Sequence, residues 1–161
     1  MPRIRIGQSA DIHQLVDGRP LVLGGVEIES PKGLLGHSDA DVLLHAIAES
    51  ILGALALGDL GKHYPDTDPR FAGVRSTLLL EDVCAKMKEK HYRVGNIDAT
   101  VFAEKPKLAP YIDLMRSNVA QILDCEMDQV SIKATRGEKL GFVGRMEGMA
   151  AMSVCLLEED V

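Results

Sequence analysis

Cysteine is scarce in this sequence, and its three copies, Cys84, Cys125 and Cys155, are an odd number without a C-x-x-C pair. This argues against a disulfide framework and against a zinc site built from thiolates. Long apolar runs are also missing. The stretch from Ile51 to Leu57 already contains Gly53 and is far shorter than the roughly 20 residues of a membrane span. The N-terminus lacks the apolar core of a signal peptide, so we expect a soluble protein of the reducing cytoplasm with no membrane partner.

Basic residues are fewer than acidic ones. The chain has 18 Lys and Arg against 24 Asp and Glu, which gives a formal net charge of −6. Binding to a nucleic-acid backbone needs a basic face, so no nucleic-acid partner is expected. The glycine patterns of P-loop and Rossmann nucleotide sites, G-x-x-x-x-G-K-[S/T] and G-x-G-x-x-G, are absent. Any phosphate that the protein binds must therefore be held by local groups.

The composition is that of an ordinary globular protein. Hydrophobic residues make up 46% of the 161 positions and charged residues 26%, which excludes wholesale disorder. No linker, repeat or low-complexity segment interrupts the chain, so we expect one domain over residues 1–161. A chain of this length buries roughly 70% of the surface that its unfolded form exposes.

Hydrophobic periodicity and turn residues predict alternating strands and helices. Gly24-Gly25 supplies the positive φ angles of a two-residue hairpin turn. Ser38 followed by Asp41 resembles a capping box at a helix start, Ser76 is expected to cap a second helix, and Gly95 to close the connection that follows it. The expected strands are 3–6, 21–23, 26–28, 97–103, 130–134 and 149–157, and the expected helices begin near residues 38, 76 and 110.

The last expected strand is largely apolar on both faces. Met149, Ala151 and Leu157 lie on one face, and Met152 and Val154 on the other. In a chain this small, helices are expected to cover one face and a second subunit the other. The predicted fold class is thus α+β: a single domain with a mixed β-sheet covered by helices on one face, plus an N-terminal hairpin, with subunits packed sheet to sheet in a trimer.

Three side chains form a candidate zinc site. Asp11 and His13 follow the first strand and are two residues apart, so that in extended backbone they project from the same face. His45 lies on the first helix in line with Asp41 and Glu49. Two imidazoles and one carboxylate leave a fourth zinc position open, which is the catalytic pattern. The alternatives are an aspartate that orients a surface histidine and a solvated helix face.

Three loops could bind anionic or hydroxylated groups. Residues 36–41 precede a helix, whose free N–H groups attract anions, although its aspartates could simply cap the helix. The acidic residues of 58–61 and 64–69 are either turn formers or ligands for ribose hydroxyls or a divalent ion. Residues 135–145 combine three glycines with three basic residues, as in a phosphate-binding loop or merely a basic loop.

Together these motifs resemble the 2-C-methyl-D-erythritol 2,4-cyclodiphosphate synthase family. The resemblance covers essentially the whole chain and is carried by D-x-H at 11–13, G-H-S-D-A-D-V-L-L-H-A-I at 36–47, L-G-A at 52–54, G-D-L-G-K at 58–62, Y-P-D-T-D-P at 64–69 and E-K-L-G-F-V-G-R at 138–145.

The resemblance implies an enzyme of non-mevalonate isoprenoid biosynthesis. It would convert 4-diphosphocytidyl-2-C-methyl-D-erythritol 2-phosphate to the cyclic diphosphate with release of CMP, as a phosphorus–oxygen lyase. It also implies a homotrimer with active sites between subunits and a cytidine diphosphate-linked substrate. One Zn²⁺ per subunit would bind Asp11, His13 and His45, and a Mg²⁺ or Mn²⁺ would bind Glu138.

By position, His37 and Glu138 match catalytic residues of the family. Phe142 and Arg145 match the lining of a central cavity of the trimer. The substrate-binding residues implied by the resemblance are Asp11, His13, His37, Ser38, Asp59, Leu60, Gly61, Asp66, Asp68, Ala103, Lys105, Pro106, Lys107, Leu108, Thr135, Glu138, Phe142 and Arg145.

The chain departs from the family pattern at three positions. Ser9 stands where the family usually has Gly, Arg136 where it has a small hydroxyl residue, and Met152 where it often has Glu. Two other functions remain open on the residues alone. One is a zinc-dependent phosphohydrolase that acts on a nucleotide, and the other is a non-catalytic trimeric protein that binds a metal or a nucleotide.

Overall fold

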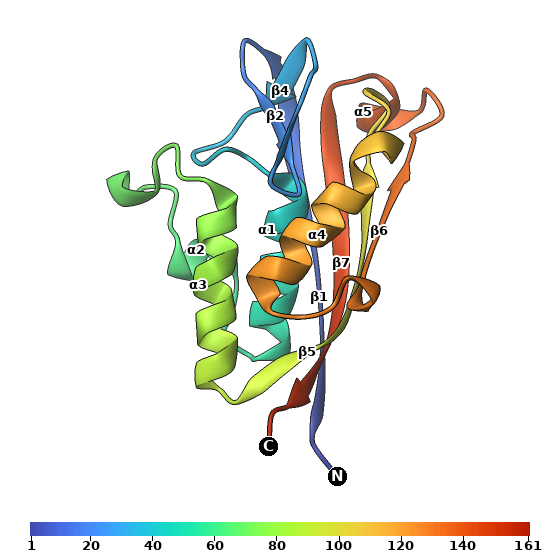
Figure 1. The fold of residues 1–161 in the computed structure, drawn as a ribbon. Coiled ribbons are helices and arrows are strands. Elements are labelled where there is room, and N and C mark those ends of the chain that lie inside the picture. The colour runs from blue at the N-terminus through green and yellow to red at the C-terminus, as the bar shows by residue number, and fades with distance from the viewer.

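A five-stranded mixed sheet with helices on one face organises the chain (Figure 1). The structure is a computed structural model and describes residues 1–161. Its elements are β1 (Ile4–Asp17), β2 (Leu21–Leu23), β3 (Val26–Ile28), β4 (Lys32–Leu34), α1 (Val42–Ala54), α2 (Leu60–His63), the 3₁₀ turn η1 (Pro69–Phe71), α3 (Ser76–Glu89), β5 (Tyr92–Phe102), η2 (Ala109–Tyr111), α4 (Ile112–Leu123), η3 (Met127–Gln129), β6 (Val130–Thr135), α5 (Gly141–Gly144) and β7 (Gly148–Glu159).

The strands of the main sheet lie in the order β4-β1-β7-β5-β6, in which only the β5–β6 pair is parallel. This confirms the predicted mixed sheet, but the first strand is much longer than the sequence pattern predicts. It continues to Asp17 because β7 pairs with it from Ile4 to Gln14 and β4 pairs with it from Leu15 to Asp17. Asp11 and His13 therefore lie inside β1 and not after it, where the pairing to β7 fixes their backbone.

Helix α1 packs directly on β1 and β7 and is almost wholly buried. Its contact with β1 depends on Gly7, because a Cβ atom at that position would lie 1.8 Å from the carbonyl oxygen of Ser50. The predicted start of this helix is wrong by three residues. Its N-cap is Asp41, whose carboxylate accepts the Leu44 N–H at 3.0 Å, and not Ser38, because the positive φ of Ala40 still turns the chain after Ser38.

Two further predictions concern turns. The β2–β3 hairpin is confirmed, with Gly24 and Gly25 at φ of 57° and 74°. Gly95 does not close the connection after α3 as predicted. It lies within β5 at a register shift, and the turn is made by His91 in the left-handed conformation. Strand β5 consequently starts five residues earlier than the predicted residue 97.

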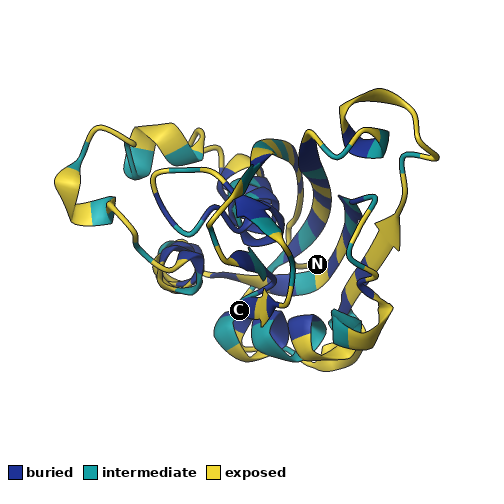
Figure 2. Cartoon of the chain, turned by 90° about the horizontal axis from the view of Figure 1, so that it is seen from above, coloured by how far each residue is buried: buried dark blue, intermediate teal, exposed yellow.

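The last strand has one covered and one open face, as its sequence predicts. Met149, Ala151 and Leu157 are fully buried on the face toward the helices, whereas Met152 and Val154 are 50% and 49% exposed. Figure 2 shows this alternation of buried and exposed residues along the long strands. The open face continues onto β1, where the exposed apolar side chains are those of Ile4, Ile6 and Ile12.

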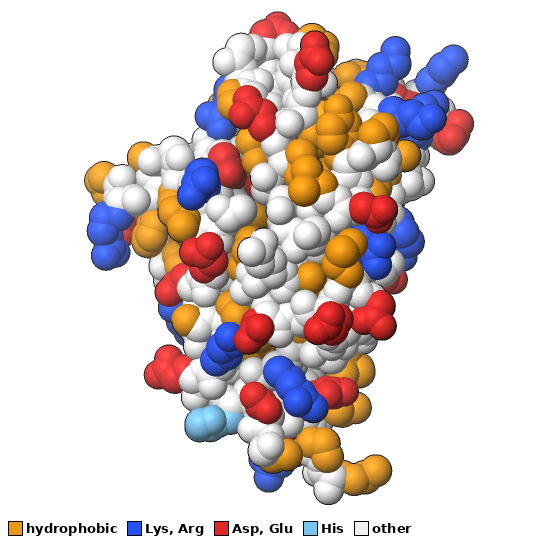
Figure 3. Space-filling model, viewed as in Figure 1, with side chains coloured by type: hydrophobic (Ala, Val, Ile, Leu, Met, Phe, Trp, Pro, Cys, Tyr) orange, Lys and Arg blue, Asp and Glu red, His pale blue; other side chains and the backbone are white.

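The outer surface on the helical side is mixed in charge (Figure 3). Acidic and basic side chains alternate over most of it, and several basic side chains gather at the upper right, near the end of β6 and α5. The exposed basic residues on the segment from the end of β6 to the residue after α5 are Arg136, Lys139 and Arg145, and Lys107 lines a cavity together with Arg136. None of the helices has both the length and the apolar character needed to cross a membrane.

Candidate functional site

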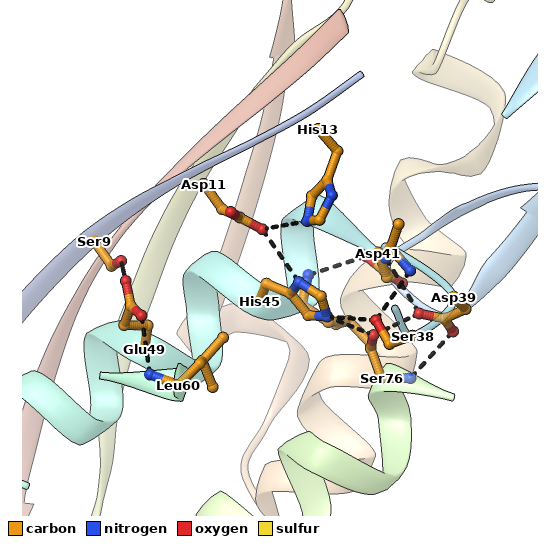
Figure 4. Close-up of polar contacts among 12 residues, drawn as sticks. Ser9, Asp11, His13, Ser38, Asp39, Asp41, His45, Glu49, Leu60 and Ser76 are labelled. Carbon is orange, nitrogen blue, oxygen red and sulfur yellow. Dashed lines mark hydrogen bonds and ion pairs between the residues drawn. The ribbon is translucent and has the colours of Figure 1, made fainter. Parts of the chain in front are cut away.

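Asp11, His13 and His45 converge although 34 residues separate the first from the last. The Oδ2 atom of Asp11 lies 3.0 Å from His13 Nε2 and 3.1 Å from His45 Nδ1. The pairing of β1 with β7 holds the first two side chains, and α1 brings the third to them (Figure 4). One donor atom from each residue lies within 4.8 Å of the other two. The two distances from Asp11, 3.0 and 3.1 Å, are close to the spacing of about 3.3 Å in a tetrahedral site with ligand bonds of about 2.0–2.1 Å.

The backbone fixes the orientation of His13. Its Nδ1 lies 2.8 Å from the carbonyl oxygen of Leu35, and because a carbonyl only accepts hydrogen bonds, Nδ1 carries the proton. In the neutral ring Nε2 then has a lone pair, and this lone pair is directed at the Asp11 carboxylate. Metal-binding histidines are usually held in this way by a partner on the second ring nitrogen.

A second chain of hydrogen bonds fixes His45. The Ser76 hydroxyl donates to a carboxylate oxygen of Asp39 and so must accept the hydrogen bond from His45 Nε2, at 2.8 Å. The Ser38 hydroxyl also contacts Nε2, at 3.2 Å. Since Nε2 carries the proton, the lone pair of Nδ1 is directed at Asp11.

Three groups with free lone pairs thus face one another, which requires a positive charge among them. In the metal-free chain that charge is a proton. Burial raises the pKa of the Asp11 carboxyl, but hydrogen bonds with His13 and His45 outweigh this effect and hold its pKa well below the usual range. Burial lowers the pKa of His13, but Asp11 outweighs it and raises that pKa above 6.5. One carboxylate and two imidazoles with an open side also suit a zinc ion.

A pocket of about 420 Å³ opens beside these donors. Its volume falls within the usual range for small-molecule sites. The sequence-predicted site residues that line it come from β1, α1, the loop before α1, α2 and the loop after α2. They are Asp11, His13, His37, Ser38, His45, Leu60, Gly61 and Asp66.

Two predicted residues near this pocket have structural partners. Asp59 is the N-cap of α2 and accepts the Lys62 N–H at 3.0 Å. Asp68 is the N-cap of η1 and forms an ion pair with Arg70 at 2.7 Å, while its backbone carbonyl contacts the imidazole of His37. Neither carboxylate lines the pocket.

The remaining predicted residues lie elsewhere on the chain. A separate cavity of about 200 Å³ is lined by Ala103, Pro106, Lys107, Leu108 and Thr135. A third, of about 570 Å³, is lined by Phe142 and Arg145 and shares His13 with the first. Lys105 and Glu138 line none of these three. A single chain therefore does not gather the whole predicted site.

Sequence reasoning missed three residues that shape the site. Asp39 was considered only as part of an anion site before a helix or as a possible cap of that helix. Ser76 was predicted to cap the second helix, but it is the first residue of α3 and its hydroxyl makes no cap. Together Asp39 and Ser76 hold His45. Glu49 was noted only as part of a polar stripe, and it lines the pocket. Its spacing of four residues from His45 was the available indication.

The chain matches the model of the YgbB family over residues 4–158. It is 58% identical over 156 residues to the 2-C-methyl-D-erythritol 2,4-cyclodiphosphate synthase of Geobacillus kaustophilus, covering 97% of this chain and 99% of that protein. It is 59% identical to the synthase of Geobacter metallireducens, with coverage of 96% and 99%.

Solved structures with names from the same family match this chain in fold as well as in sequence. The Plasmodium falciparum IspF CDP complex matches with a TM-score of 0.86 and 33% identity, over 98% of this chain and 97% of that one. The bifunctional IspDF from Campylobacter jejuni matches with a TM-score of 0.94 and 43% identity; the match covers 99% of this chain but only 43% of that longer one. From its sequence, its fold and its Asp11–His13–His45 cluster, the chain belongs to the YgbB family of 2-C-methyl-D-erythritol 2,4-cyclodiphosphate synthases.

Proposed function

We propose that the chain converts 4-diphosphocytidyl-2-C-methyl-D-erythritol 2-phosphate to 2-C-methyl-D-erythritol 2,4-cyclodiphosphate and CMP in the non-mevalonate pathway. The reaction is a lyase-type intramolecular phosphoryl transfer. Relatives that carry this name and match nearly the full chain support it. The observation that carries the proposal is the convergence of Asp11, His13 and His45 at the wall of a substrate-sized pocket.

The substrate supplies its own nucleophile. An oxygen of its 2-phosphate attacks the β-phosphorus of the diphosphate, the bond from that phosphorus to the bridging oxygen breaks, and CMP leaves with the electron pair. A phosphate monoester with a second pKa of about 6 is mostly ionised near neutral pH, so no general base is required. The Ser38 hydroxyl does lie 3.2 Å from His45 Nε2 at the edge of the pocket. Because that nitrogen carries the proton, it cannot act as the base that would activate Ser38 as a nucleophile.

The chain's main contribution is then to hold both ends of one molecule in attack geometry. Orientation of this kind can supply about 7–11 kcal/mol of a barrier. We assign His37 and Ser38 to the diphosphate and the erythritol part of the substrate. Asp59, Leu60 and Gly61 are assigned to the erythritol end, and Asp66 to the loop beside it. The cavity lined by Ala103, Pro106, Lys107 and Leu108, with Lys105 in the same segment, is assigned to the cytosine. Thr135 is assigned to the phosphates, and Asp68 to the loop beside His37.

We assign Zn²⁺ to Asp11, His13 and His45, and a Mg²⁺ or Mn²⁺ to Glu138. When bound, such ions polarise phosphoryl oxygens and neutralise the charge on the leaving group. The zinc assignment is supported by the imidazole and carboxylate donors and by the hydrogen bonds that hold each ring. Glu138 is exposed, with a positive φ of 54° that turns the loop after β6.

We also propose that three copies of the chain, each one domain over residues 1–161, assemble through the open faces of their sheets. One support is the row of exposed apolar residues on β1 and β7. The other is that, within one chain, the cavity assigned to the cytosine is separate from the pocket beside the metal ligands. Phe142 and Arg145 would line the centre of this trimer. Light scattering should give about 52 kDa, three times 17.5 kDa, and Ile6→Asp should lower that mass.

The three free cysteines favour the cytoplasm as the setting.

The reaction itself is tested in water enriched in ¹⁸O. Cyclisation involves no water, so both the cyclic diphosphate and CMP should contain no label. The competing zinc phosphohydrolase would use water as nucleophile and place ¹⁸O in a linear product, which would refute the proposal. His45→Ala should abolish turnover, and an unchanged rate would contradict the role assigned to His45. A wild-type chain that binds the substrate but forms no product would favour a binding protein without catalysis.

A further inference from the structure

Glu49 connects three elements beside the pocket. It lies on α1 one turn after His45, and its Oε1 accepts a hydrogen bond from the Ser9 hydroxyl on β1. Its Oε2 accepts the backbone N–H of Leu60, the first residue of α2, at 3.0 Å. Both carboxylate oxygens are therefore engaged, and Figure 4 shows the side chain directed away from the metal-binding cluster toward α2.

Helix α2 makes few other hydrogen bonds to the body of the protein, although the half-buried side chains of Leu60 and Tyr64 pack against its core. None of its four residues is buried, and its hydrogen bonds to Asp59 and Leu57 are local. The second attachment through a side chain is at its other end, where the Tyr64 hydroxyl donates to Asp82 on α3. Glu49 thus fixes the start of this segment and Asp82 fixes its end.

The start of α2 forms part of the pocket wall, where Leu60 and Gly61 lie. The first N–H groups of any helix have no partner within it. Here Glu49 takes the N–H of Leu60 and Asp59 takes that of Lys62, which leaves the N–H of Gly61 without a partner in the chain. The carboxylate of Glu49 therefore decides where a free backbone donor points at the edge of the pocket.

We propose that Glu49, with its side chain held by Ser9, is a positioning residue that fixes the Leu60–Gly61 wall relative to the metal ligands. Ser9 is 6% exposed and lies two residues before Asp11 on the same strand, so the wall and the ligand share one rigid support. The role in turnover rests on the proposed function, whereas the effect on α2 does not.

The test compares Glu49→Ala with Glu49→Gln in the full chain. The first readout is hydrogen exchange of the amides of residues 58–64, and the second is metal content. Glu49→Ala should speed exchange in this segment about tenfold or more, because a hydrogen bond to a charged group is lost. Metal content should stay at the wild-type level. Glu49→Gln should exchange like wild type, since its amide oxygen still accepts the Leu60 N–H and its NH₂ group can donate to Ser9.

Steady-state kinetics give the third readout. Loss of a contact made equally in the ground and transition states raises KM and leaves kcat nearly unchanged, so Glu49→Ala should raise KM about tenfold. Glu81→Ala, on the exposed side of α3, is the matched control and should alter nothing. Should Glu49→Ala not fold, Ser9→Ala provides the same comparison through loss of one hydrogen bond.

Three outcomes would overturn the proposal: unchanged exchange in residues 58–64, loss of metal from Glu49→Ala, or failure of Glu49→Gln to restore wild-type exchange. An inactive wild-type enzyme would refute the proposed function instead, and the exchange measurement would still decide the role of Glu49.

Discussion

Replacement of Ser76 by alanine tests whether the surroundings of His45 control metal binding. The Ser76 hydroxyl is the nearest acceptor for His45 Nε2, at 2.8 Å, and it passes this hydrogen bond on to Asp39. Ser76 is 1% exposed, so water does not replace the lost hydroxyl easily. The backbone N–H of Ser76 still donates to Asp39 after the substitution, at 3.1 Å, and the start of α3 is preserved.

The expected loss of zinc affinity depends on which hydrogen-bond acceptors remain at His45 Nε2 after the substitution. Loss of an outer hydrogen-bond partner of a metal ligand lowers metal affinity about 10–100-fold, or about 1.4–2.7 kcal/mol. Ser38 remains 3.2 Å from Nε2 as a weaker acceptor, so Ser76→Ala should lie near the lower limit, about tenfold. The double variant Ser38→Ala/Ser76→Ala removes both acceptors and should approach about a hundredfold.

The assay is a competition titration of the metal-free protein with Zn²⁺ against a chromophoric chelator. Ser50→Ala is the matched control because Ser50 is also a buried serine, on α1, and its hydroxyl binds Ile47 and Ser153 away from the site. The control should lose stability but retain zinc affinity. If Ser76→Ala binds zinc as tightly as wild type, the hydrogen bond to Nε2 does not control the ligand, and the argument for the site from its ring orientation is wrong.

Three further predictions follow from the geometry. Burial raises the pKa of the Cys125 thiol to about 11, so alkylation of the native protein followed by mass spectrometry should be slow at pH 8 and should accelerate toward pH 11; fast labelling at pH 8 would contradict the burial. Gly7→Ala should destabilise the fold by about 3 kcal/mol or more in urea unfolding, since its Cβ would overlap the carbonyl of Ser50, and a variant with wild-type stability would disprove that contact. In the metal-free protein, the lowered pKa of Asp11 stabilises the fold above its unfolded value of 3.8, and this contribution is lost as the pH falls; Asp11→Asn should therefore show a shallower decrease in stability between pH 4 and 2, and identical curves would exclude the effect.

Local patterns sufficed wherever a few neighbouring residues decide the structure. Gly24-Gly25 predicted the β2–β3 hairpin because only residues that accept positive φ make such a turn. Apolar periodicity predicted a helix in the region of α1. The alternation in β7 predicted one covered face and one open face, and both are present.

Local patterns failed where a distant segment supplies the partner. The extent of β1 depends on the hydrogen bonds that β7 provides, and the start of α1 depends on a carboxylate that also binds the N–H groups of Gly24 and Gly25. The role of Ser76 depends on Asp39, 37 residues away. The residues adjacent to these positions in the sequence do not indicate which distant segment supplies the hydrogen-bond partner.

By itself the sequence determined which donor types are present and which of them share a strand or a helix: Asp11 with His13, and His45 with Glu49. Only the tertiary structure decided that the two pairs meet, that Leu35 and Ser76 orient the imidazoles, and that Glu49 is directed at α2. The physical reason is that residue spacing sets the direction of a side chain within one element, whereas the packing of α1 on β1, allowed by the missing side chain of Gly7, sets the distance between elements.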